Sequence, residues 1–177
     1  MYTVQVKIKG VTPLLMNKFV EKEANPQKKG EEEDTPELAK EKVYRNDKGE
    51  IIVPAEMILR AMDKVSSEFK IEGMKKVTAK NLLPGNIFIE PEGIKIEPQN
   101  FVIDKRTVVI PATRGRIMRY RPKFPEWKLE FKIHIFDDRI KPEILQHILS
   151  EAGRRVGIGD GRKIGFGRFV IEQFSKI

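Results

Sequence analysis

Residues 156–169 read Val-Gly-Ile-Gly-Asp-Gly-Arg-Lys-Ile-Gly-Phe-Gly-Arg-Phe, and this stretch decides the expected fold. Glycine adopts backbone conformations closed to other residues and lets a second backbone, such as a phosphodiester, approach closely. Three cations, Arg162, Lys163 and Arg168, lie among the glycines. The sequence therefore predicts a loop that binds phosphate groups, and its five glycines are Gly157, Gly159, Gly161, Gly165 and Gly167.

Two familiar glycine motifs do not fit this stretch. A dinucleotide-binding fingerprint lies between a strand and the helix that follows it. Here the loop follows a helical pattern and precedes a predicted strand over about 167–174. A nucleotide-binding P-loop requires Gly-Lys followed by Ser or Thr, whereas residues 161–164 read Gly-Arg-Lys-Ile. The loop is therefore not predicted to bind a nucleotide cofactor.

The flanking periodicity predicts the other elements. Alternation of apolar and polar residues predicts strands over 2–9 and 128–135, and a short apolar run predicts a third over 51–53. Helical spacing predicts one amphipathic helix over about 54–69 and another from Pro142 to a stop before Gly153. Between them, residues 77–112 contain short apolar runs separated by turn signals, which predict β-hairpins.

The order of these elements predicts an α+β fold. We expect a ferredoxin-like (RRM-like) antiparallel sheet with two helices on one face, elaborated by the β-hairpins of 77–112. The length of 177 residues suits a single domain over 1–177. The other sheet face is expected to stay open and to present four lysines, Lys7, Lys9, Lys128 and Lys132.

Composition excludes several classes of protein. The chain has no cysteine, which removes disulfides, thiolate metal sites and cysteine nucleophiles. Its two histidines, His134 and His147, argue against a multi-histidine metal site. No apolar run approaches the roughly 20 residues of a membrane span. We therefore expect a cytoplasmic protein that uses no metal or cofactor and does not bind membranes.

The charge is unevenly distributed. The chain carries 34 Lys and Arg against 26 Asp and Glu, a formal net charge of +8, which favours a polyanionic partner. Residues 21–50 are acidic overall and contain few apolar residues before position 43, so we expect a charged, mobile insertion. A solvated loop without function is the simpler reading of such a run.

The opposite extreme is the segment 105–123, which contains seven Lys and Arg and no acid. Arginine forks suit phosphates and aromatic faces suit unstacked bases, so this mixture fits single-stranded nucleic acid. A twisted edge strand kept soluble by its charges is the alternative. The residues expected to form a basic track beside the glycine loop are Arg114, Arg116, Arg119, Tyr120 and Arg121.

The glycine loop resembles that of the RAMP superfamily, the RNA-binding proteins of CRISPR-Cas systems. Gly157-Ile158-Gly159 and Gly165-Phe166-Gly167 match the family's two glycine-apolar-glycine units, placed between the last helix and the last strand. A second similarity is a short strand, a proline and a helix that contains an arginine in its first two turns, as in residues 51–60 with Arg60. This helix departs from the family pattern because Glu56 and Met57 replace small residues.

The resemblance implies a subunit that binds single-stranded guide RNA without catalysis, with other CRISPR-Cas subunits or copies of itself as partners. The alternatives are a single-stranded DNA-binding protein of a phage or mobile element, and a metal-independent endoribonuclease that cuts CRISPR transcripts. Such a nuclease needs a group that transfers protons near neutral pH. His134, on the polar face of its strand, is the candidate for that group. A backbone subunit can also cut target RNA with an acidic residue, for which Asp34, Asp47 and Asp160 are candidates, although a lone aspartate is more often a turn or cap residue. The sequence thus favours a binding protein.

Overall fold

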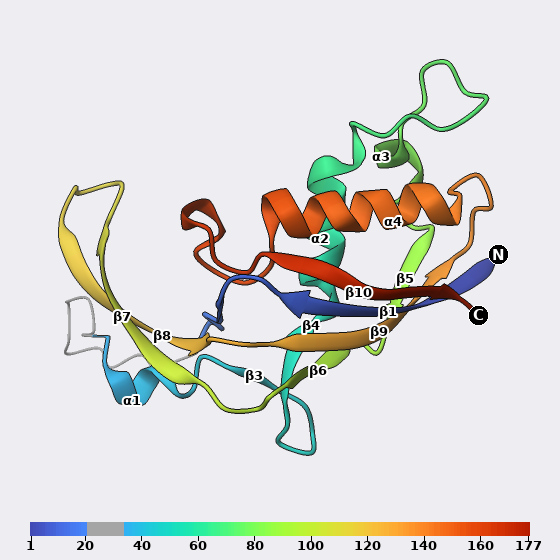
Figure 1. Cartoon of the computed structure of the whole chain (residues 1–177). Coiled ribbons are helices and arrows are strands. Elements are labelled where there is room, and N and C mark those ends of the chain that lie inside the picture. The colour runs from blue at the N-terminus through green and yellow to red at the C-terminus, as the bar shows by residue number, and fades with distance from the viewer. Residues whose placement is uncertain (21–33) are drawn as a thin grey trace.

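A computed structural model describes residues 1–20 and 34–177 (Figure 1). The main sheet has the strand order β10–β1–β9–β6–β4–β3, with β5 also paired to β9, and every pairing is antiparallel. A smaller sheet has the order β2–β8–β7. The strands are β1 (Tyr2–Gly10), β2 (Leu14–Leu15), β3 (Tyr44–Arg45), β4 (Ile51–Pro54), β5 (Ile87–Glu90), β6 (Gly93–Glu97), β7 (Val102–Val109), β8 (Arg116–Phe124), β9 (Lys128–Ile135) and β10 (Phe169–Lys176).

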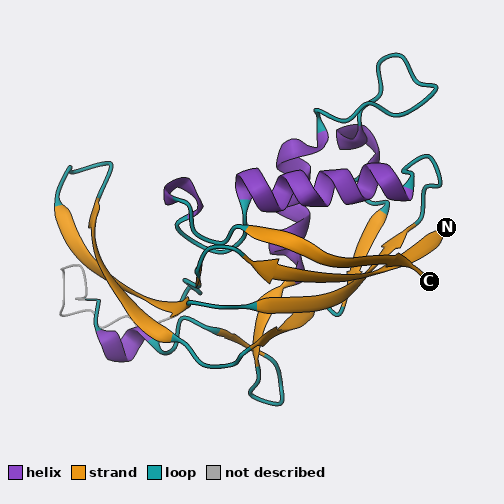
Figure 2. Cartoon of the chain, in the orientation of Figure 1, coloured by secondary structure: helices purple, strands orange, loops and turns teal. Residues whose placement is uncertain are grey.

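Two amphipathic helices cover one face of the main sheet (Figure 2). Helix α2 (Ala55–Ser66) begins directly after Pro54, which lacks an N–H that would otherwise be unpaired there. Helix α4 (Pro142–Glu151) begins at its own proline. The predicted apolar stripes of both helices are buried against the inward residues of β1 and β9. The α+β, ferredoxin-like prediction is confirmed. Two one-turn helices, α1 (Pro36–Ala39) and α3 (Ala79–Leu82), complete the set.

The end of the last helix differs from the prediction. Gly153 does not stop the helix, because α4 continues into a π-helical turn over Ala152–Val156. Gly153 is buried, and a Cβ atom there would overlap the backbone oxygen of Phe169. This glycine therefore serves close packing between the helix and β10, and Gly157, with φ of +75°, is the residue that ends the turn.

The hairpin pattern within 77–112 also differs from the prediction. Strands β5 and β6 do not pair with each other, and both pair with β9, at Lys132–Ile135 and at Lys128–Leu129 respectively. They belong to the main sheet because β9 is long enough to hold both along one edge. The hairpin that leaves the body is instead β7–β8, so it extends from residue 102 to residue 124 and contains the basic segment (Figure 1).

Part of the expected insertion over 21–50 is packed into the structure. Residues 21–33 lie outside the described residues, whereas 34–50 form α1 and β3. Asp34, Lys42 and Val43 are buried, so the acidic composition of this stretch conceals contacts that hold its second half to β8. Among residues 1–20 and 34–177, no helix is long and apolar enough to cross a bilayer.

Candidate nucleic-acid interface

The glycines of the loop have two different structural roles. All five have positive φ, between +67° and +96°. A Cβ at Gly167 would overlap the carbonyl oxygen of Ile158, and one at Gly159 would lie 2.5 Å from the carbonyl oxygen of Leu15. At Gly165 nothing lies within 4 Å of that position. At Gly159 and Gly167 it is therefore the chain's own backbone that approaches the glycine closely. Among the five loop glycines, only Gly165 combines positive φ with open space in the described structure.

Most backbone amides of the loop are already used. Ile158 donates to the carbonyl of Gly167, Asp160 to that of Leu15, and Gly167 to that of Pro13. The guanidinium of Arg168 donates to the carbonyls of Val156 and Arg162. The predicted phosphate ligand Arg168 thus braces the loop from within. The cations left for a ligand are Arg162, which is half-buried, and Lys163, which is exposed.

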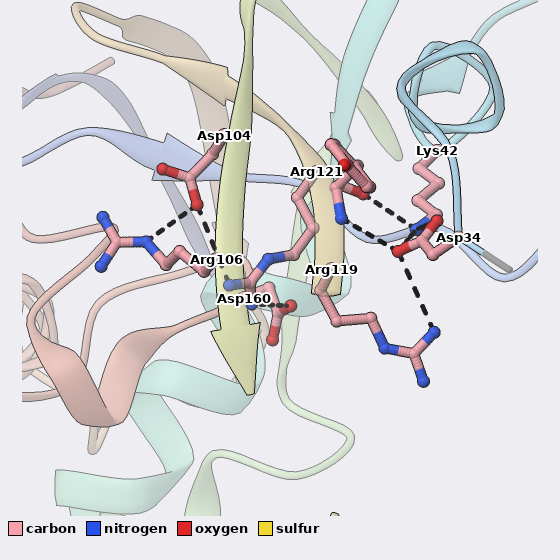
Figure 3. Close-up of polar contacts among 8 residues, drawn as sticks. Asp34, Lys42, Asp104, Arg106, Arg119, Arg121 and Asp160 are labelled. Atoms are coloured by element: carbon pink, nitrogen blue, oxygen red, sulfur yellow. Dashed lines mark hydrogen bonds and ion pairs between the residues drawn. The ribbon is translucent and has the colours of Figure 1, made fainter. Parts of the chain in front are cut away.

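The hairpin and the glycine loop are joined by an ion pair (Figure 3). Arg121 of β8 lies 2.9 Å from the carboxylate of Asp160 in the loop, and its side chain is only 9% exposed. Its Nε has no hydrogen-bond partner within the described part of the chain. Arg121 was expected in the exposed basic track, and the structure instead places it in the seam between hairpin and loop.

A buried carboxylate on β7 gathers three cations of the hairpin. Asp104 is 5% exposed and lies 2.8 Å from Arg106 and 4.0 Å from Arg121 (Figure 3). It also lies 3.6 Å from Lys123. Arg106 also lies over the ring of Phe166, 4.7 Å from its centroid. Phe166 is 9% exposed, so this aromatic packs in the seam and is not free to stack on a base.

A second buried pair holds α1 to the edge of β8. Lys42 Nζ lies 2.7 Å from Asp34 Oδ1, and it also donates to the carbonyl of Tyr120. The amide of Tyr120 donates to Asp34 at 2.9 Å. Burial alone would raise the pKa of Asp34, but these hydrogen bonds and the charges of Lys42 and Arg119 together lower it. Asp34 therefore has a structural role, as the carboxylate that holds Lys42 and the backbone of Tyr120 together.

The exposed cations of the hairpin are divided between its faces. Directly opposed residues share a face in an antiparallel pair, so Lys105 and Tyr120 lie on one face and Arg106 and Arg119 on the other. Lys105 Nζ lies 5.8 Å from the centroid of the Tyr120 ring, which is half-buried. The remaining predicted track residues are exposed, with Arg116 at the start of β8 and Arg114 in the connecting turn.

The structure brings two predicted residues from opposite ends of the chain together. Arg60 of α2 and Arg162 of the glycine loop both line a hollow of about 510 Å³. Arg60 is hydrogen-bonded to Glu56 at 2.5 Å along its own helix. The two elements that carried the family resemblance therefore meet at one place in the fold.

The candidate catalytic residues are not assembled into a site. His134 lies on the open sheet face, where Nδ1 contacts the Thr3 hydroxyl at 3.0 Å and Nε2 contacts Glu90 at 2.9 Å. Both ring nitrogens therefore have partners from neighbouring strands. Asp160 binds Arg121, and Asp47 is exposed in the turn between β3 and β4.

The open sheet face is not a uniformly basic surface. Lys7 lies 3.3 Å from Glu130, and Lys128 lies 3.2 Å from Glu172. The alternation that predicted this face is correct, but the lysines expected on it are interleaved with acids on adjacent strands. The charges of Lys7 and Lys128 are locally compensated, whereas Lys105, Arg116 and Lys163 of the hairpin and loop have no acidic partner within the described residues.

The antiparallel ferredoxin-like sheet, whose last helix leads through a glycine-rich loop into its last strand, has the arrangement of elements that the resemblance in the sequence implies. No family model matches the sequence, and no curated protein matches it either.

Several solved structures share this fold, and two of them illustrate it. One is a chain of the type III-B Cmr-beta complex bound to cognate target RNA, with a TM-score of 0.66 and 15% identity. The match covers 99% of this chain and 60% of that one, so the chain spans less than two thirds of its length. The other is Cmr6 from Pyrococcus furiosus, with a TM-score of 0.54, 12% identity and coverage of 96% and 97%.

Proposed function

We propose that this protein is a non-catalytic subunit of a CRISPR-type ribonucleoprotein that binds single-stranded guide RNA. The glycine loop and the β7–β8 hairpin together form the RNA-binding surface. The observation that carries the proposal is the Arg121–Asp160 pair, which fixes the two most basic segments of the sequence against each other. Such a subunit acts in the cytoplasm, in antiviral defence, alongside other CRISPR subunits or further copies of this chain.

The chemistry of the surface favours phosphates over base edges. Its exposed groups are lysines and arginines, which attract a polyanion irrespective of sequence. Because most loop amides are already paired, the side chains of Arg162 and Lys163 are the loop's phosphate ligands. Tyr120 is the aromatic group beside the track on which a base can stack. The Cmr-beta structure, which contains a target RNA, supports this assignment by analogy of fold.

A binding role agrees with the arrangement of the titratable groups. Proton transfer to RNA requires a histidine or carboxylate within hydrogen-bonding reach of the ribose or the leaving oxygen. His134 lies between Thr3 and Glu90 on the open face, and Asp34 is buried under a lysine. These contacts support binding without cleavage.

The test is RNA binding measured by fluorescence anisotropy over a range of salt concentrations. The double variant R162A/K163A is compared with K128A/R139A, which also removes two exposed cations but takes them from the pairs with Glu172 and Asp137. Each lost phosphate contact reduces the slope of log K against log salt by about 0.7 for single strands. We expect R162A/K163A to reduce it by about 1.4 and the control to leave it unchanged.

Three results would contradict the proposal. Equal effects of the two double variants would mean that the loop has no special role. A DNA oligonucleotide of the same sequence that competes better than the RNA would favour the single-stranded DNA-binding alternative. Absence of binding to any oligonucleotide at low salt would leave an acidic protein as the partner of the basic surface.

A further inference from the structure

A hollow of about 510 Å³ lies between α2, residues 83–87 and the glycine loop. Its volume falls within the range of small-ligand sites. Apolar side chains form much of its lining, and charged ones complete it. The apolar group comprises Leu59, Met62, Leu83, Pro84 and Ile87, and the charged group comprises Arg60, Asp63, Lys64 and Arg162.

The charged lining has an excess of cations. Among the described residues, Asp63 is the only acid in it, and it lies 4.0 Å from Lys80 on the neighbouring helix. Arg60 is held by Glu56. Lys64 and Arg162 have no acidic partner among residues 1–20 and 34–177. A hollow that combines apolar walls with unpaired cations suits a flat, weakly polar ring attached to an anionic group.

The hollow is continuous with the proposed RNA-binding surface. Arg162 belongs both to the glycine loop and to the lining, so a strand whose phosphates contact the loop passes this opening. Within the part of the chain that the structure describes, the lining provides no side-chain amide or hydroxyl that would read a base edge. Contact with the base is therefore expected to depend on its ring and not on its identity.

We infer that this hollow receives one unstacked nucleotide of the bound strand. The base packs on Leu59 and Ile87, while Lys64 and Arg162 hold the adjoining phosphate. The inference rests on the proposed function and names a subsite of it. The same chemistry, a base bearing a phosphate, also occurs in a free mononucleotide, and the experiment separates these two sources.

The experiment uses short unstructured RNAs that each carry one 2-aminopurine at a different position. Binding is followed by anisotropy, and unstacking by the emission of 2-aminopurine, which is quenched in a stack. With the wild-type protein we expect emission to rise at one position in the bound strand and to stay constant at its neighbours. Adenosine monophosphate is then added as a competitor. If it abolishes the rise in emission at a concentration comparable to that of the RNA, the hollow binds free mononucleotides, and the assignment to the RNA strand is overturned.

Two variants test the lining. Leu59→Trp fills the hollow, so it should abolish the emission change and weaken binding about fivefold or more, the loss expected for one base contact. Val170→Trp, at an exposed site on β10, adds the same side chain away from the hollow and should leave both signals unchanged. Lys64→Ala leaves the apolar walls intact and removes one proposed phosphate contact. It should therefore weaken RNA binding and reduce the salt slope, and it tests the hollow even if Leu59→Trp does not fold.

The outcomes separate this inference from the proposed function. If no RNA binds at low salt, the proposed function fails and the subsite fails with it. If RNA binds normally but emission is flat at every position, or is unchanged in Leu59→Trp, only the subsite is refuted.

Discussion

The Arg121–Asp160 pair makes an asymmetric prediction about stability. Arg121 is 9% exposed at its side chain, whereas the side chain of Asp160 is 38% exposed. Replacing Asp160 with Ala leaves the guanidinium buried, with Asp104 at 4.0 Å as its nearest remaining carboxylate. Replacing Arg121 with Met fills the same space with an apolar chain and leaves Asp160 in contact with water. The loss of the aspartate should therefore destabilise the protein more than the loss of the arginine.

The magnitudes follow from the exposures. Removing one partner of a fully buried ion pair costs about 3–5 kcal/mol because the other charge stays uncompensated. The secondary contact with Asp104 offsets part of this for Asp160→Ala, so we expect a loss of about 2–4 kcal/mol. In Arg121→Met the exposed carboxylate of Asp160 is hydrated by water, and Asp104 keeps its contacts with Arg106 and Lys123. We therefore expect the free energy of unfolding to fall by about 1–2 kcal/mol.

The assay is urea unfolding followed by tryptophan fluorescence. Trp127 is the single tryptophan and is 1% exposed, so its emission reports loss of the core. Arg116→Met, at an exposed position on the same strand, is the matched control and should change stability by less than about 0.5 kcal/mol. A larger loss for Arg121→Met than for Asp160→Ala would refute the reasoning, because it would mean that packing and not the buried charge dominates the seam.

Three further predictions concern the loop, the buried aspartate and catalysis. Gly167→Ala should lower the free energy of unfolding by more than about 3 kcal/mol, because its Cβ overlaps the Ile158 carbonyl oxygen. Gly165→Ala should lower it by about 1–2 kcal/mol, because only its positive φ is unfavourable. Equal losses in urea unfolding would contradict this. The lowered pKa of Asp34 contributes stability that is present above its ordinary pKa of 3.8 and is lost as pH falls below it. Asp34→Asn should thus be less stable than wild type by about 3 kcal/mol at pH 6, with the gap narrowing in urea titrations at lower pH, and a constant gap would count against the buried pair. Wild-type protein and His134→Ala should both leave a labelled RNA intact on a denaturing gel, and cleavage that the substitution abolishes would establish a nuclease.

Local sequence patterns predicted the elements better than their partners. The alternation over 2–9 and 128–135 correctly indicates β1 and β9, because one face of each strand is buried under the helices. The same patterns do not reveal that β5 and β6 share β9, since strand pairing depends on which edges remain free after the helices pack. Gly153 was misread for a related reason, because a glycine buried against β10 and a glycine that ends a helix look alike in sequence.

Charge patterns predicted the site only in part. The segment 105–123 contains no acid, so Arg121 looks identical to Arg119 in sequence, although the structure buries one and exposes the other. Asp104, which immediately precedes the segment, was missed as the centre of its ion cluster. The signal for Asp104 is its position: it is a single aspartate at the start of a basic run, on a strand that pairs with that run.

The burial of part of the basic segment sets a quantitative limit on RNA binding. The segment 105–123 and the loop together contain ten Lys and Arg, which at about 0.7 per contact would give a salt slope near −7. Arg121 and Arg168 are held in internal contacts, and Arg106 and Lys123 face Asp104. The six that remain are Lys105, Arg114, Arg116, Arg119, Arg162 and Lys163, and together with Lys64 of the hollow they give a slope of about −5 if all contact phosphates. Lys105 and Arg119 lie on opposite faces of the hairpin. A single RNA strand can therefore contact both only by passing around the edge of the hairpin. A measured slope steeper than about −5 would require Arg106 or Lys123 to exchange Asp104 for phosphate, so the slope reports whether the hairpin keeps its ion cluster when RNA binds.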